Sequence, residues 1–98
     1  MTSNGSDGGA MRIDAGFILR EIAGEYVIVP TGKTALIFNG MLTANAMGIF
    51  LWEHLKEDVT EEELVASVVS EYDIDEKTAR NDIQEFLEVL RQSKILIE

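Results

Sequence analysis

The sequence predicts an α+β fold in which a three-stranded antiparallel sheet is followed by three helices. Two observations indicate this order. The segment from Phe17 to Phe38 is rich in β-branched and aromatic residues and is interrupted by turn residues. From Asn45 onward, apolar residues instead recur at the helical period, and this second half contains two helix-start signals, at Thr60 and Asp75.

The chain length predicts one domain preceded by a tail. With 98 residues, of which 46% are hydrophobic, the chain can bury one core and is too short for two. The first residues, from Met1 to Ala10, are rich in Gly, Ser and Asn, which bury too little apolar surface to become ordered. We therefore expect residues 1–14 to form a disordered tail or an expression scar, and residues 15–98 to form the domain.

Turn residues set the limits of the three predicted strands. Phe17–Ile22 is the first strand, and Ala23-Gly24 forms a short hairpin loop into Glu25–Val29. Pro30 ends the second strand because it has no amide hydrogen to donate to a ladder. The turn at Pro30–Lys33 then leads into Thr34–Phe38, which we predict to be the third strand.

Capping residues and apolar stripes define the three predicted helices. Thr60 followed by Glu63 is a capping box, and Asp75 is a favourable N-cap. The expected helices span about Asn45 to Lys56, Thr60 to Tyr72, and Asp75 to Gln92, after which Ile95–Ile97 adds a brief strand or packs on the core.

Composition argues against most catalytic and cofactor-binding functions. The chain has no Cys and one His, His54, which falls on an apolar stripe and is expected to be a packing residue. No cysteine or histidine pair for nucleophilic catalysis or zinc is available, and no phosphate-binding glycine motif occurs. We therefore predict no catalytic residue, no metal and no cofactor, and expect a cytoplasmic protein.

The net charge of −10 disfavours nucleic acid, but one helical stripe is basic and polar. Lys77, Arg80, Gln84 and Arg91 recur at spacings of three, four and seven, with Leu87 beside them. One interpretation is that this stripe meets an extended ligand with acidic side chains and apolar anchors. The alternative is that the basic residues pair with neighbouring acids on the same surface, namely Asp73, Glu76 or Asp82.

The predicted third strand contains no charged residue, although a free sheet edge is normally protected by charge or proline. A peptide that adds as a further strand would cover such an edge. The alternative is that Thr34–Phe38 is a central strand or is covered by a helix.

The order of these segments resembles the PqqD family. The resemblance rests on spaced positions over roughly residues 15–98, namely Val29–Gly32, Phe38-Asn39, Asn45–Trp52, Thr60–Leu64, Glu71–Asp73 and Asp82–Leu87. It implies a winged-helix-like, non-catalytic peptide chaperone that binds the leader of a ribosomally made precursor peptide and presents it to a radical S-adenosylmethionine enzyme or another modifying enzyme. The product would be pyrroloquinoline quinone or a related peptide-derived compound. The implied peptide contacts are Thr34, Ala35, Leu36, Ile37 and Phe38 on the strand, and Lys77, Arg80, Gln84, Leu87 and Arg91 on the helix.

Two other functions remain open from the sequence. A winged-helix regulator would place the third helix in the major groove of DNA, against the overall negative charge. An assembly domain would pair its free edge with another protein or with a second copy. We expect no nucleic acid or membrane partner, and a monomer or weak dimer.

The sequence departs from part of the PqqD family between the first and second predicted helices. Lys56–Val59 stands where the family members that serve pyrroloquinoline quinone synthesis tend to have an Asp-Gly turn, so a relative that serves another peptide is an equal alternative.

Overall fold

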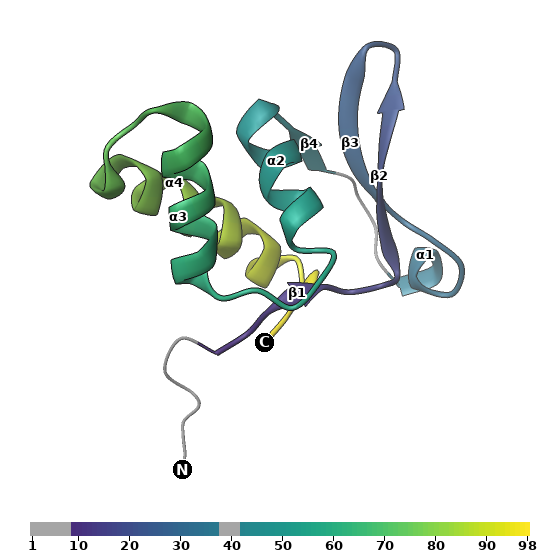
Figure 1. Cartoon of the computed structure of the whole chain (residues 1–98). Helices are drawn as coiled ribbons and strands as arrows, with labels where there is room; N and C mark the ends of the chain where they lie inside the picture. The colour runs from purple at the N-terminus through teal and green to yellow at the C-terminus, as the bar shows by residue number, and fades with distance from the viewer. Residues whose placement is uncertain (1–8, 38–41) are drawn as a thin grey trace.

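The computed structural model describes residues 9–37 and 42–98. Figure 1 shows a β2–β3 hairpin standing beside a group of helices, with the described part of the N-terminal segment crossing the C-terminal strand below them. The elements are β1 (Arg12–Ile13), β2 (Phe17–Ile22), β3 (Glu25–Pro30), α1 (Thr34–Ile37), β4 (Leu42–Ala44), α2 (Ala46–His54), α3 (Glu61–Tyr72), α4 (Glu76–Gln92) and β5 (Leu96–Ile97).

The predicted fold class is confirmed, because a three-stranded antiparallel sheet precedes three helices. The strand order is β2-β3-β4. The β2–β3 hairpin turns at Ala23-Gly24, where both residues have positive φ, at 54° and 84°. A two-residue turn of this kind matches the twist of the flanking strands, and glycine adopts it without a steric penalty. The predicted hairpin loop is therefore confirmed.

The prediction of a third strand at Thr34–Phe38 is wrong. Thr34–Ile37 forms the short helix α1, and Leu42–Ala44 is the strand that pairs with β3. Phe38 lies outside the described residues. The backbone amide of Thr31 donates to the Gly16 carbonyl at 2.8 Å, and this bond ties the chain to the start of β2. The amide of Thr34 then donates to the Thr31 carbonyl at 3.0 Å, so the turn continues into a helix and does not return along β3.

The predicted helix starts are confirmed by their caps. Thr60 Oγ1 accepts from the Glu63 amide at 3.1 Å, while Glu63 Oε1 accepts from the Thr60 amide at 2.9 Å, which completes the capping box. Asp75 caps α4 by accepting from the Thr78 amide at 3.2 Å. The Asn45 side chain caps α2 by accepting from the Gly48 amide at 2.8 Å, and this positions α2 directly after β4.

The N-terminal limit of the fold lies earlier than the expected boundary at residue 15. Arg12 and Ile13 form β1, which pairs with β5, and Met11 exchanges two backbone hydrogen bonds with Val59. Met11 and Ile13 are both buried in the core. Residues 11–14 therefore belong to the domain, whereas residues 1–8 lie outside the described residues. The sequence left open whether Ile95–Ile97 forms a brief strand or packs on the core. Both occur, since Ile95 is buried and Leu96–Ile97 forms β5.

One apolar core joins the sheet to the helices. Its fully buried members come from β3, from all three longer helices and from the segment before β5, and include Ile28, Leu51, Leu64, Ile83 and Ile95. Among the described residues, no polar or charged side chain is buried. Within these same residues, no helix combines the length and apolar content that crossing a bilayer requires.

Candidate peptide-binding site

The strand β4 forms one edge of the sheet. In the part of the chain that the structure describes, β4 is paired with β3 and has no strand on its other side. In an edge strand, alternate backbone amides and carbonyls point away from the sheet and can pair with an added strand. Leu42, Thr43 and Ala44 carry no charge that would oppose such pairing.

An apolar hollow of about 210 Å³ lies between β4 and α4. Its lining residues come from β3, from β4 with the adjoining cap of α2, and from α4: Ile28, Leu42, Thr43, Ala44, Asn45, Phe86, Val89 and Leu90. Ile28 and Leu90 are fully buried and form its floor, whereas Val89 is 44% exposed. An extended segment on β4 would therefore cover an apolar surface that the described residues leave open to water.

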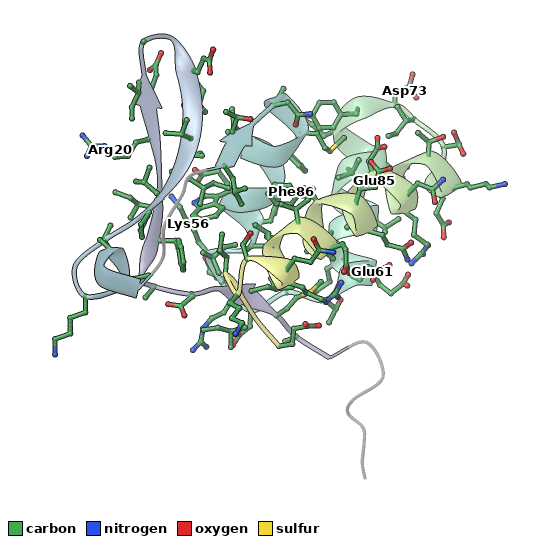
Figure 2. The ribbon with its side chains drawn as sticks, turned by 180° about the vertical axis from the view of Figure 1, so that it is seen from behind. Arg20, Lys56, Glu61, Asp73, Glu85 and Phe86 are labelled. Atoms are coloured by element: carbon green, nitrogen blue, oxygen red, sulfur yellow. The ribbon has the colours of Figure 1, made fainter. Side chains whose placement is uncertain are left out.

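A second hollow, of about 310 Å³, continues along α4 toward the start of α2. It shares Asn45, Phe86 and Val89 with the first hollow and adds Asp82 and Glu85. Figure 2 shows Phe86 between α4 and the segment that carries β4 and α2, with Glu85 close to it on α4. We call the two hollows together the β4–α4 groove.

Of the predicted strand contacts, Thr34 and Ala35 do not line this groove. Thr34, Ala35, Leu36 and Ile37 form α1, which Figure 1 shows beside the base of the β2–β3 hairpin, on the side away from α4. Phe38 lies outside the described residues. A peptide contact at these five positions stays a prediction, and the structure offers β4 as the free edge in their place.

Arg80 and Gln84 face α3 and not the sheet. Arg80 donates to Glu62 at 2.9 and 3.1 Å, to Glu61 at 3.3 Å and to Glu76 at 3.0 Å. Gln84 Nε2 donates to the same Glu61 carboxylate at 3.0 Å. The hydrogen bond and the charge of Arg80 lower the pKa of Glu62 below its ordinary value. The alternative in which Arg80 pairs with Glu76 is therefore confirmed.

The remaining stripe residues are also turned away from β4. Arg91 is held by Glu98 at 2.9 Å and by Glu88 at 3.6 Å, and Leu87 is 0% exposed. Lys77 is exposed and makes no ion pair with another described residue. At about 100° per residue, the face that carries Arg80, Gln84 and Arg91 lies nearly opposite the face that carries Phe86 and Val89. A binding role for the stripe stays a prediction.

The sequence reading missed Val89 and all three residues of β4. One signal was present, because Val89 is an apolar residue out of phase with the core stripe of α4, which consists of Ala79, Ile83, Leu87 and Leu90. Single exposed apolar residues are common on helix surfaces, so this signal alone did not identify a contact. For Leu42–Ala44, the available signal was only a short uncharged segment after a turn.

His54 is a packing residue of α2, as predicted. Its ring lies 4.5 Å from that of Phe50, centroid to centroid, and the side chain is half-buried. Across residues 9–37 and 42–98, no group of three or more His, Cys, Asp or Glu residues is arranged to hold a metal ion.

Known proteins resemble this chain in sequence family and in fold. No curated protein matches the sequence. A solved structure described as "TbiB1 in Complex with the TbiA(beta) Leader Peptide" superimposes with a TM-score of 0.68 at 25% sequence identity, over 87% of this chain and 93% of that chain. The family model described as Coenzyme PQQ synthesis protein D (PqqD) matches residues 25–96. Since that match spans β3 through β5 and most of the chain, the protein belongs to the PqqD family.

Proposed function

We propose that this protein is a non-catalytic recognition domain that binds the leader segment of a ribosomally made precursor peptide. The leader adds as a strand along β4 and rests in the β4–α4 groove. The observation that carries the proposal is the free, uncharged edge of β4 beside an apolar groove. The similarity to TbiB1, whose structure contains a leader peptide, supports it.

The bound peptide is then presented to a separate modifying enzyme, which we propose to be a radical S-adenosylmethionine enzyme. The domain contributes effective concentration, since holding a flexible peptide beside an enzyme makes the second encounter intramolecular. It performs no chemistry itself. We place this work in the cytoplasm, where ribosomes release the precursor.

The DNA-binding alternative is weakened by the same geometry. Arg80 and Arg91, which would meet phosphates, are each held by glutamates. A net charge of −10 adds a repulsive field that phosphate contacts would have to overcome. A gel shift at low salt is expected to show no complex.

An amide-resolved NMR titration with a short precursor peptide, if one is encoded beside the gene, tests the proposal. We expect saturable shifts at Leu42–Ala44, Phe86 and Val89. Two versions of the peptide, N-methylated at alternate residues in opposite registers, test strand addition without altering the protein. One version should lose binding and the other should keep it, because only every second amide of an added strand faces β4.

A pair of variants distinguishes peptide binding in the groove from non-specific hydrophobic binding elsewhere on the surface. Val89→Ser should weaken binding, whereas Ile22→Ser, at a similarly exposed apolar residue on the hairpin, should not. Shifts away from β4, or equal tolerance of both N-methylated peptides, would reject strand addition. A molecular mass that doubles with concentration, combined with no peptide response, would indicate self-pairing of the edge.

A further inference from the structure

We propose that the peptide segment recognised by the β4–α4 groove carries Lys or Arg side chains next to its apolar anchors. The inference rests on the function proposed above and specifies its ligand. It reverses the expectation from the sequence, in which a basic stripe on the third helix would meet an acidic ligand.

The size and lining of the groove indicate an apolar anchor. Its first hollow, about 210 Å³, is smaller than the roughly 300 Å³ at which pockets for drug-sized ligands begin. Phe86, Val89 and Leu42 line it above the buried floor. Such a space suits one or two apolar side chains of an extended chain, whose alternate residues point to the same face.

The rim of the groove is acidic. Asp82 and Glu85 line the second hollow, whereas Glu25 lies outside the groove, in a separate hollow of about 390 Å³ that borders the other side of the Ala44–Asn45 corner. Asn45 borders all three hollows. No Lys or Arg among the described residues lines any of them, so the charged side chains that line these hollows are all acidic.

These three carboxylates also lack cationic partners within the described chain. Glu61, Glu62 and Glu76 each form an ion pair with Arg80, and Glu88 and Glu98 each form one with Arg91. By contrast, Glu25, Asp82 and Glu85 make no ion pair or side-chain hydrogen bond with any residue from 9–37 or 42–98. The arginines of α4 are held on its far face, and this leaves the groove side with uncompensated negative charge.

One feature opposes this charge, but it is smaller. The N-terminus of α2 points toward the same corner and carries about half a positive charge, part of which the Asn45 cap already satisfies. The two full carboxylates that line the groove, Asp82 and Glu85, exceed it. A cationic side chain beside the apolar anchor would therefore gain attraction, whereas an acidic one would be repelled.

Selection from a phage-displayed library of random peptides tests the inference. The targets are the wild-type protein, the groove variant Asp82→Asn/Glu85→Gln, and the control variant Glu57→Gln/Glu71→Gln. The control removes the same two charges from exposed sites outside the groove, which matters because a protein of charge −10 attracts cationic peptides everywhere.

We expect wild-type and control proteins to select peptides that combine apolar residues with Lys or Arg. The groove variant should still select the apolar residues but lose the basic preference, and a peptide selected on the wild type should bind it roughly two- to thirtyfold more weakly. The loss should shrink at high salt.

The outcomes separate this inference from the function on which it rests. Selected peptides that shift the amides of Leu42–Ala44 but show no excess of Lys or Arg would overturn the basic-ligand inference alone. The same holds if groove and control variants lose the basic preference equally. Selected peptides that leave the β4 amides unshifted would overturn the proposed function as well. Because all four substitutions are near-isosteric and exposed, unchanged amide spectra verify folding.

Discussion

Phe86 of α4 lies against Gly48 of α2, so closely that a Cβ added at Gly48 would stand 3.1 Å from Phe86 Cε1. This contact fixes the ring at the point where the two hollows of the β4–α4 groove meet. Because Gly48 has no side chain, Phe86 can lie close to α2, and this position of the ring sets the shape of the β4–α4 groove.

Gly48→Ala is expected to weaken peptide binding with little effect on stability. Alanine favours the helix by about 0.5–1 kcal/mol relative to glycine, and this gain offsets part of the displacement of Phe86. The displaced ring has the groove as its open side, so it narrows the apolar hollow. Calorimetric titration with the leader peptide and chemical denaturation measure the two effects. Gly48→Val should lose both binding and stability, and unchanged binding in both variants would contradict the role of this contact.

Gly16→Ala is expected to destabilise the fold by about 1–3 kcal/mol. A Cβ at this position would collide with Thr34 Oγ1, while the Gly16 amide is held by Asp14 Oδ1 at 2.8 Å and its carbonyl by Thr31. These bonds prevent an easy backbone shift. Urea denaturation of Gly16→Ala, Thr34→Ala and the double variant measures the coupling. The double variant should recover part of the loss, and strict additivity would show that the collision is relieved elsewhere.

The ion pair between Arg80 and Glu62 predicts a specific pH dependence. Arg80 lowers the pKa of Glu62 from its ordinary value of 4.5 in the folded state. A lowered folded-state pKa means that its stabilising contribution is present above pH 4.5 and is lost as pH falls through the lower folded value. Denaturation at a series of pH values should show this decline in the wild type. In Arg80→Gln the decline should be shallower below pH 4.5, and identical slopes would contradict the linkage.

Ile13 tests whether the fold begins before residue 15. Ile13 is 8% exposed and pairs with Leu96, whereas Ile97 in the same ribbon is 38% exposed. Ile13→Ala is expected to lower the free energy of unfolding by about 2–4 kcal/mol, and Ile97→Ala by under about 1 kcal/mol. Equal, small effects in thermal denaturation would place the N-terminal strand outside the cooperative unit.

Local features of the fold were readable from the sequence because they depend on residues within a few positions of one another. The capping box joins Thr60 to Glu63 and the α4 cap joins Asp75 to Thr78, each three residues apart. The hairpin turn at Ala23-Gly24 and the core stripe of α4 are likewise set by short spacings. The interactions that form them join residues only a few positions apart, so they do not depend on distant segments.

The candidate site depended on contacts that no short spacing reveals. Arg80 meets Glu61 across 19 positions, and that packing of α3 on α4 decided which face of α4 was left for the sheet. The hydrogen bond from Thr31 to Gly16, 15 positions apart, redirected Thr34–Ile37 into a helix and left the edge to β4. The sequence by itself determined the fold class, the starts of the three longer helices and the net charge. Only the tertiary structure decided which strand is the free edge and which charges face it, because both follow from how distant segments share hydrogen bonds and apolar surface.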